Sequence, residues 1–436
     1  YIQGYQNETE ELGEKQLQDT IEKLKQEYRK KDCVILYFIG LTESYEGEGY
    51  DRKNLKIPQN QEELLAEIAE TVGRDHIAAI SFGGAPMDFS FEKNVGAILH
   101  MYLGGQAVGE SVADLISGEV NPSGKLAETI PFSEKDTPAW RYFAPPNDDV
   151  EYRESIFVGY RYYETFHVPV KYPFGYGLSY TSFSYSELNV PEVYSGGKIQ
   201  IRFKIKNIGK VSGAEIAQLY ICPIESDVIR SHIELKGFQK IYLYPGEEKE
   251  VILELDERSF SVYDVEKKAF SMLSGKYQIC IGASVHDLQL KANMEVVGNS
   301  YFRNERELFP DYFREQPHGM EISAEQFYQL LGGEPKHDKE KKRGEYTVYD
   351  SYQDVVNVSM FGKFVRGVVH IGLKIILRGK SERDPAFKMV KMGVEEGNLE
   401  GLIATSGGIA TPKLIDMLVY NANKKYLQAF KRLLKK

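Results

Sequence analysis

The feature that most constrains this chain is a change in the period of its apolar residues, about one third of the way along. Before residue 145, short continuous apolar runs such as 33–39 and 76–82 alternate with stretches of helical spacing. Continuous runs of this kind are typical of strands buried on both faces. From Phe183 to Val297 the period is two, which is typical of antiparallel strands with one buried face. A chain with both patterns folds into more than one domain.

The first part predicts an α/β domain with a parallel sheet between helices. Helices are expected at 12–29, 61–72 and 106–117, the last stopping at Gly118, and strands at 33–39, 76–82 and 95–102. In such sheets ligands gather at the carboxyl ends of the strands. The loops that leave those ends are 40–55, 83–89 and 103–109.

The second part begins after a Tyr- and Gly-rich connector that starts at residue 146. Strands with period two are clearest at 199–205, 216–220, 251–255 and 277–281. Turn signals at Asn207-Ile208-Gly209, Pro245-Gly246 and Ser274-Gly275 separate them. Short strands at this spacing predict an antiparallel sandwich of immunoglobulin-like type.

The last part, from residue 301, predicts a helical extension. A Lys- and Glu-rich hinge, expected to be mobile, covers His337–Arg343, and helices follow at 352–377, 385–394 and 412–434. Thr411 followed by Pro412 is a sound helix start. The basic C-terminal residues suit the negative end of a helix dipole, which favours a solvated helix end over a membrane or nucleic-acid patch.

The composition restricts the partners of the whole chain. With 54 Lys and Arg against 64 Asp and Glu, the net charge of −10 argues against nucleic acid and anionic membrane as partners. The eight histidines are scattered and the Gly-Gly turns lack a phosphate-loop lysine, so neither a metal nor a cofactor is predicted. Three cysteines without short spacing predict reduced thiols and favour the cytoplasm. The start at Tyr1, without Met or leader, suggests a fragment or a processed product.

The candidate chemistry lies in the loop after the first apolar strand, Ser44–Arg52. Glycines on both sides of Glu48 allow the backbone to present its carboxylate at a loop tip, and Asp51 with Arg52 offers an ion pair to fix the loop. A single carboxyl group in a cleft serves as a general acid when burial raises its pKa. The alternative is an acidic surface turn without function. The 30 tyrosines likewise suit either sugar recognition or Tyr-rich β-structure.

Several motifs in a fixed order give this loop a wider context. They are Glu46-Gly47-Glu48-Gly49-Tyr50-Asp51-Arg52, Gly104-Gly105-Gln106, Asn121-Pro122-Ser123-Gly124-Lys125-Leu126, Gly159-Tyr160-Arg161-Tyr162-Tyr163 and Phe174-Gly175-Tyr176-Gly177. The series resembles the C-terminal half of family 3 glycoside hydrolases, the β-glucosidase and β-xylosidase group, over about residues 10–300. That family combines a barrel, an α/β sandwich and a fibronectin-like domain.

The resemblance implies specific roles for the loop. Residues 46–52 match the family's acid/base loop position by position, which gives the acid/base role to Glu48. Asp51 and Arg52 are then loop anchors, and Tyr50 is a candidate substrate contact. The family's Gly-Gln-Glu motif reads Gly105-Gln106-Ala107 here, so any role of its glutamate is lost. We expect Ala107 to lie at a helix start, away from the scissile bond.

The resemblance also implies an activity, a retaining exo-β-glycosidase acting on β-linked glycosides, most nearly a β-glucosidase. The family's nucleophile is an aspartate in the N-terminal barrel, which we expect to be missing, so this chain alone should be inactive. The alternative is a non-catalytic carbohydrate-binding or assembly module in which the Glu48 loop is a relic. Homo-oligomerisation is left open.

The resulting prediction is a multi-domain fold of α/β plus all-β type. Residues 1–165 form a partial α/β sandwich with a parallel sheet, incomplete at its N-terminus, and 166–182 form a connector. Residues 183–300 form a fibronectin type III-like β-sandwich, and 301–436 form the helical extension. For the extension, packing against the body is favoured over partner binding, and a membrane-surface role is favoured least.

Overall fold

The computed structural model describes residues 14–30, 33–42, 45–47, 52, 54–143, 150–298, 304–334, 341–376, 378, 384–395, 397–406 and 408–434. Their contacts divide the chain into two compact units. The first holds the described residues of 14–39 and 54–334, and the second holds those of 40–52 and 341–434. Each unit is described by itself.

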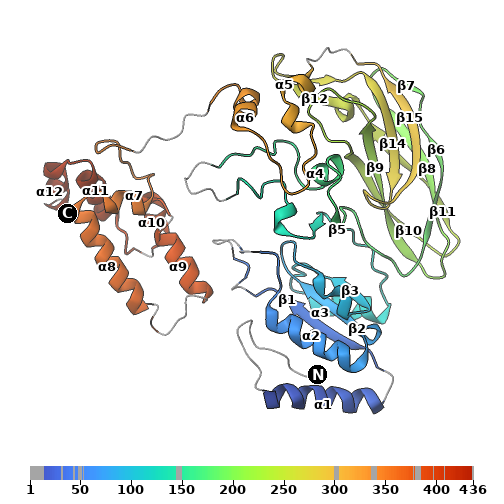
Figure 1. The fold of residues 1–436 in the computed structure, drawn as a ribbon, viewed down its shortest axis with the longest axis horizontal. Coiled ribbons are helices and arrows are strands. Elements are labelled where there is room, and N and C mark those ends of the chain that lie inside the picture. Colours follow the sequence, from blue (N-terminus) through green and yellow to red (C-terminus); the bar gives the residue numbers. More distant parts are fainter. Residues whose placement is uncertain are drawn as a thin grey trace. The chain divides into compact units, whose positions relative to one another are not determined.

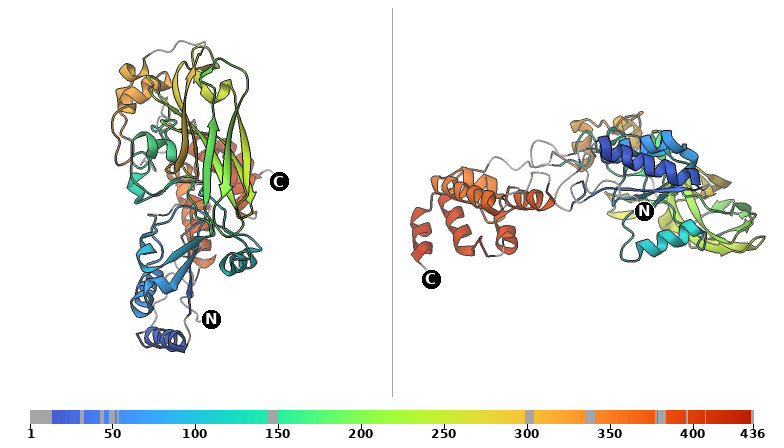
Figure 2. Two further views of the ribbon diagram at one scale, coloured as in Figure 1. Left: turned by 90° about the vertical axis from the view of Figure 1, so that its right-hand side faces the viewer. Right: turned by 90° about the horizontal axis from the view of Figure 1, so that it is seen from below.

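The first unit begins with the predicted α/β domain. Its elements are α1 (Glu14–Lys30), β1 (Ile35–Gly40), α2 (Gln59–Val72), β2 (Ile77–Phe82), β3 (Ala97–His100) and α3 (Val108–Ser117), with short 3₁₀ helices at Arg74–His76 and Ser90–Asn94 (Figure 1). The strands form one sheet in the order β1-β2-β3, and β2 and β3 run parallel. Helix α1 lies alongside α2 (Figure 2). The mixed α/β domain with a parallel sheet is therefore confirmed.

Strand β1 departs from the prediction of a strand buried on both faces. The side chains of Val34, Leu36 and Phe38 are 64%, 40% and 59% exposed, whereas that of Ile39 is 2% exposed. Among the described residues β1 is an edge strand, and they cover only one of its faces. The apolar run therefore predicted the strand correctly, but the prediction that both of its faces are buried was wrong.

The end of α3 agrees with the prediction at Gly118. This glycine has φ +78°, and its backbone N–H donates to the carbonyl oxygen of Leu115. A left-handed residue after the last helical turn is where glycine avoids the steric penalty of a Cβ atom.

The β-rich domain is the predicted antiparallel sandwich. Its strands are β6 (Phe183–Asn189), β7 (Val193–Tyr194), β8 (Ile199–Asn207), β9 (Gly213–Pro223), β10 (Glu234–Leu243), β11 (Glu248–Leu255), β12 (Ser261–Asp264), β13 (Ala269–Met272), β14 (Gly275–Gly282) and β15 (Leu288–Val296). One sheet has the order β10-β9-β14-β15-β7 and the other β11-β8-β6, and a 3₁₀ helix, Glu257–Phe260, precedes the hairpin β12-β13. The two sheets bury a common core that includes Phe203, Leu219 and Ile279.

A third layer joins the connector to the first part of the extension. It contains β4 (Ile130–Pro131), α4 (Tyr160–Thr165), β5 (Val170–Tyr172), α5 (Glu305–Leu308) and α6 (Ala324–Leu331), with 3₁₀ helices at Glu134–Asp136 and Pro310–Tyr312. The hydroxyl of Tyr162 donates to the carbonyl oxygen of Gln316 (2.6 Å), and that of Tyr312 donates to the carbonyl oxygen of Arg153 (3.0 Å). Residues 304–334 therefore pack on the Tyr-rich segment that contains Arg153 and Tyr162.

The second unit contains the helices α7 (Tyr352–Asn357), α8 (Met360–Ile376), α9 (Pro385–Glu395), α10 (Leu399–Thr405), α11 (Pro412–Ala422) and α12 (Tyr426–Leu434). They enclose a core that includes Val355, Leu399 and Leu418. Thr411 caps α11 as predicted, since its hydroxyl accepts from the N–H of Leu414 (3.2 Å). The predicted hinge falls partly on residues 337–340, outside the described part of the chain.

Two of the long predicted helices in this unit are each two helices. The stretch 352–377 breaks at Ser359, whose hydroxyl accepts from the N–H of Gly362 (2.9 Å) and so starts α8 anew. The stretch 412–434 breaks at Asn423, after which Lys424 has φ +58°. In both places polar side chains bond to the backbone and compete with helical hydrogen bonds, which an apolar spacing does not reveal.

Candidate functional site

The carboxyl ends of β2 and β3 meet, as a parallel pair requires. The N–H of Met101 donates to the carbonyl oxygen of Ser81 (2.9 Å), and the N–H of Gly83 donates to that of Tyr102 (3.3 Å). This edge therefore brings the loop 83–89 beside the loop that begins at Leu103. Leu103 is 75% exposed, so the second loop is open to solvent.

His100 marks this edge of the sheet. Its Nδ1 atom lies 2.9 Å from the hydroxyl oxygen of Ser81, and its ring packs against those of Phe89 and Tyr102. Its Nε2 atom is buried and has no hydrogen-bond partner among the described residues, so the ring is hydrogen-bonded on one side only. Burial lowers the pKa of His100 to about 4, because the low dielectric disfavours the imidazolium. The ring is therefore neutral at physiological pH.

The loop after β2 also holds Leu55, which follows the Ser44–Arg52 loop in the chain. The N–H of Asp88 donates to the carbonyl oxygen of Leu55 (2.6 Å), and the Asp88 carboxylate accepts from the N–H of Ser90 (2.8 Å). Ile57 is only 4% exposed and leads into α2. The segment that follows the Ser44–Arg52 loop is thus anchored to the sheet edge. Sequence reasoning did not single out Ser81 or Asp88, and the only signal was a polar residue next to an apolar run.

Most of the predicted site residues lie outside the described part of the chain. These are Glu48, Tyr50 and Asp51. Arg52 is described and is half-buried, as is Glu46. The loop opens with a tight turn in which the N–H groups of Tyr45 and Glu46 both donate to the carbonyl oxygen of Thr42 (2.8 and 3.0 Å). The structure therefore describes how the loop begins and how the chain continues after it, and the role of Glu48 stays a prediction.

Ala107 lies at a helix start, as predicted. It is the N-cap residue of α3, and its carbonyl oxygen accepts from the N–H of Ser111 (3.1 Å). Gly104, earlier in the same loop, lies so close to Val108 that a Cβ at position 104 would meet a Val108 methyl carbon at 2.3 Å. Close packing therefore requires glycine at position 104, whereas Gly105 has open space around it and a φ of +68°, which is the left-handed region that favours glycine.

An ion pair ties the α/β domain to the connector. The carboxylate of Glu92 contacts the ammonium of Lys171 and accepts from the hydroxyl of Tyr172 (2.6 Å). Burial acts to raise the pKa of Glu92, but the hydrogen bonds from Lys171 and Tyr172 outweigh it, so the pKa lies below its ordinary value. Glu92 is thus an ionised structural anchor.

The Tyr-rich connector motif is structural as well. Tyr160, Tyr162 and Tyr163 are buried in α4, and the hydroxyl of Tyr160 accepts from the N–H of Leu235 in β10 (2.9 Å). The ring of Tyr160 stacks on that of Phe174 at 4.7 Å. For the tyrosines of this motif, burial favours a role in packing over a role in sugar recognition.

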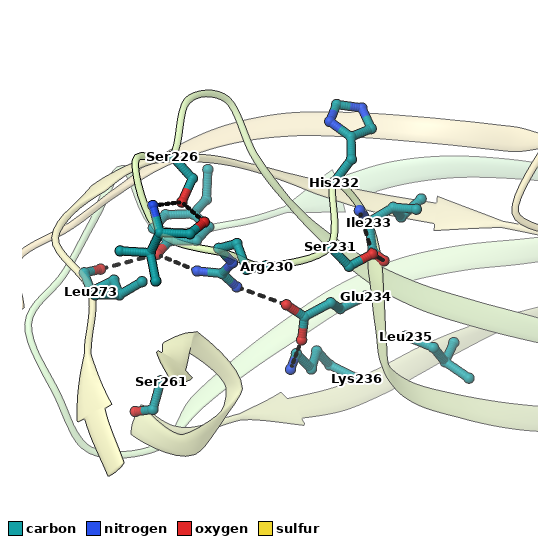
Figure 3. Close-up of polar contacts among 12 residues, drawn as sticks. Ser226, Arg230, Ser231, His232, Ile233, Glu234, Leu235, Lys236, Ser261 and Leu273 are labelled. Carbon is teal, nitrogen blue, oxygen red and sulfur yellow. Dashed lines mark hydrogen bonds and ion pairs between the residues drawn. The ribbon is translucent and has the colours of Figure 1, made fainter. Parts of the chain in front are cut away.

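A second cluster of charges lies in the β-sandwich, in the segment between β9 and β10 (Figure 3). Arg230 is 5% exposed and donates to the hydroxyl of Tyr277 and to the carboxylate of Glu234, both at 3.0 Å. The other carboxylate oxygen of Glu234 lies 2.5 Å from the ammonium of Lys236. His232 points to the other side of this segment (Figure 3). Each charge of Arg230, Glu234 and Lys236 meets an opposite charge, which makes this a structural cluster.

A cavity of about 270 Å³ lies beside the same sandwich, where Glu164, Cys222 and His232 are among its lining residues. Glu164 contacts Nε2 of His286 at 2.7 Å, and burial raises the pKa of its carboxyl group. Cys222 and Cys280 are buried free thiols with their Sγ atoms 3.8 Å apart. Among the described residues, no three His, Cys, Asp or Glu side chains come together as metal ligands.

Comparisons with known proteins place these domains. Residues 1–180 match the glycosyl hydrolase family 3 C-terminal domain, and residues 215–285 match the fibronectin type III-like domain. A thermostable β-glucosidase B of Acetivibrio thermocellus is 41% identical over 298 residues, which are 68% of this chain and 38% of the relative. An exo-α-(1→6)-L-arabinopyranosidase of Bifidobacterium breve is 37% identical over 63% of this chain and 36% of the relative.

Solved structures agree. A family 3 β-glucosidase of Bifidobacterium adolescentis superposes with a TM-score of 0.63 at 35% identity, over 67% of this chain and 42% of that one. A β-glucosidase of Kluyveromyces marxianus in complex with glucose gives a TM-score of 0.59 at 34% identity, over 64% of this chain and 34% of that one. This chain thus spans well under half the length of these relatives. It belongs to glycoside hydrolase family 3, with the family's C-terminal domain in residues 1–180 and a fibronectin type III-like domain in residues 215–285.

Proposed function

We propose that this chain is the acid/base-bearing part of a retaining exo-β-glycosidase, most nearly a β-glucosidase, in which Glu48 is the proton donor. The observation that carries the proposal is the Glu46–Arg52 loop. It has the family's acid/base pattern and leaves β1 at the edge of the sheet where ligands gather in this class of fold. The relatives named as β-glucosidases support the substrate class.

The proposed reaction has two displacements, and this chain contributes to both. In the first, a carboxylate from a barrel domain attacks the anomeric carbon while Glu48 protonates the departing glycosidic oxygen. In the second, Glu48 removes a proton from water, which attacks the anomeric carbon and releases the sugar with retained configuration. Retention places the two carboxyl groups about 5–5.5 Å apart. Asp51 and Arg52 would hold the loop, and Tyr50 would contact the leaving-group side.

The test replaces Glu48 with alanine in the complete gene product and compares two aryl glucosides. We expect hydrolysis of the substrate with a poor leaving group to fall by a factor of about 10²–10⁴, since proton donation is lost. The substrate with a good leaving group should be largely spared in its first step, and azide should restore turnover. Glu46→Ala, two residues away, is the matched control and should change either rate far less.

Three outcomes would contradict the proposal. Equal losses on both substrates would show that Glu48 does not act as the acid. Hydrolysis by the 436-residue chain alone would place the nucleophile within it. If the complete gene product binds oligosaccharide but never hydrolyses it, the chain is a carbohydrate-binding module instead.

A further inference from the structure

The charge of this chain is unevenly distributed. Residues 341–436 carry 18 Lys and Arg against 9 Asp and Glu, although the chain as a whole has a net charge of −10. Two long stretches of this region contain no acidic residue at all, 355–381 and 417–436. Helix α8 lies in the first stretch and α12 in the second. The expectation of no membrane partner rested partly on the net charge of the whole chain, which conceals this basic region, and partly on assigning the basic C-terminal residues to a solvated helix end.

Helix α8 has more apolar surface than its own core uses. One part of its apolar face packs inward through Phe361, Val365 and Val369. The neighbouring part is exposed and forms a continuous stripe, because its members recur every three or four residues. The α8 stripe consists of Met360, Phe364, Val368, Ile371 and Ile375, which are 54–90% exposed.

Helix α12, at the end of the described chain, likewise has one side that packs inward and one exposed apolar side. Its inner side is fixed by the buried Ala429 and by an ion pair between Arg432 and Asp416 of α11 (2.7 Å). Its outer side is the α12 stripe, which consists of Tyr426, Leu427, Phe430, Leu433 and Leu434, all 49–69% exposed.

Basic side chains border both stripes. Lys363 and Lys374 directly precede stripe members of α8, and Lys431 directly follows one of α12. Large apolar residues beside long cationic side chains, with no carboxylate on the same helix, are the chemistry of helices that lie in the headgroup layer of a bilayer. Lysine stems lie along apolar surface while their ammonium groups reach anionic phosphates.

We propose that α8 and α12 dock this chain on the surface of an anionic lipid bilayer. A second copy is a poorer occupant, because two surfaces with the same excess of Lys and Arg repel each other. In this proposal both helices lie in the headgroup layer and do not cross the bilayer. Within the described residues, no helix has the length and hydrophobicity to cross a bilayer. This proposal is independent of the acid/base role of Glu48.

The test is co-sedimentation of the whole chain with vesicles. We expect binding to vesicles of equal parts phosphatidylglycerol and phosphatidylcholine, little binding to pure phosphatidylcholine, and release at high salt, which screens the attraction. Phe364→Ser and Phe430→Ser should each weaken binding roughly tenfold, because each removes an inserted aromatic ring. Replacing Lys363, Lys374 and Lys431 together by glutamine should weaken it roughly a hundredfold.

The control is Phe238→Ser in β10. Phe238 is 65% exposed, close to the 67% of Phe364, but lies in the β-sandwich, so its loss should leave binding unchanged. Because all substituted side chains are largely exposed, melting temperatures should not change. Absence of binding to the anionic vesicles, or equal binding to both kinds, would overturn the proposal. So would a lipid-free dimer that Phe364→Ser dissociates, since the occupant would then be a second copy.

Discussion

At the scale of single residues, Arg230 shows how much one buried charge can matter. Its guanidinium meets Glu234 and Tyr277, and its side chain is only 2% exposed, so little water can reach it to replace these partners. Arg202, on the outer face of β8, makes a similar contact with Glu250 at 3.1 Å, but both side chains are more than two fifths exposed. The two ion pairs have similar distances between their charged atoms, but Arg230 is buried whereas Arg202 and Glu250 are largely open to solvent.

We therefore expect Arg230→Ala to lower the free energy of unfolding by about 3–5 kcal/mol, since Glu234 keeps a buried charge with one partner fewer. The matched change Arg202→Ala should lower it by no more than about 1 kcal/mol. Urea denaturation of both variants at neutral pH measures the difference. Equal losses in the two variants would mean that burial does not set the strength of the Arg230 pair.

The same pair predicts the sign of a pH effect. Burial acts to raise the pKa of Glu234, but the charges of Arg230 and Lys236 outweigh it and hold the pKa below its ordinary value of 4.5. Glu234 therefore adds stability at pH values above 4.5, and this stability is lost as the pH falls through the lowered folded-state pKa. In Arg230→Ala this acid-dependent loss should be smaller, which denaturation midpoints measured over a series of acidic pH values will show.

At the scale of elements, Asn423 explains why one apolar spacing became two helices. Its side-chain oxygen accepts from the N–H groups of Gly344 and Tyr346 (2.9 and 3.0 Å), and its nitrogen donates to the carbonyl oxygen of Tyr346 (2.7 Å). These bonds join α11 to a segment nearly eighty residues earlier in the chain. These hydrogen bonds thus fix the loop 344–346 to the end of α11.

Asn423→Ala should lower the free energy of unfolding by about 3 kcal/mol, because it removes three hydrogen bonds to partly buried backbone groups. Asn421→Ala is the control. Among the described residues, its amide bonds only to the Met417 carbonyl oxygen of its own helix (2.8 Å), so a change of less than about 1 kcal/mol is expected. Thermal unfolding of the two variants gives both values. If they melt alike, the long-range bonds of Asn423 are not what holds the loop.

The sequence predicted the elements better than their surroundings. Thr411 and Pro412, Gly118 and the period-two strands carry their structural reasons locally, so these predictions were confirmed. The break at Asn423 and the bare face of β1 depend on partners distant in the chain, which local spacing does not encode. The candidate site divides the same way. The Glu48 loop was visible as a motif, whereas the bonds joining Asp88 to Leu55 and Ser81 to His100 needed coordinates.

At the scale of the whole molecule, the two units have separate cores and should unfold separately. Leu418 is 1% exposed in the core of the second unit, and Ile279 is 0% exposed in the sandwich core of the first. Calorimetry should show two transitions. Leu418→Ala should lower one of them and Ile279→Ala the other, each by the equivalent of about 2–5 kcal/mol. A single transition that moves with both substitutions would mean that the units are coupled.

The bare face of β1 has a consequence for handling the protein. A strand at the margin of the described sheet, with the exposed apolar side chains Val34, Leu36 and Phe38, is a template for another extended segment. In concentrated solution this margin is where one molecule would first adhere to the next. Leu36→Lys would place a charge on that margin, and natural proteins use such charges to prevent edge strands from pairing between molecules.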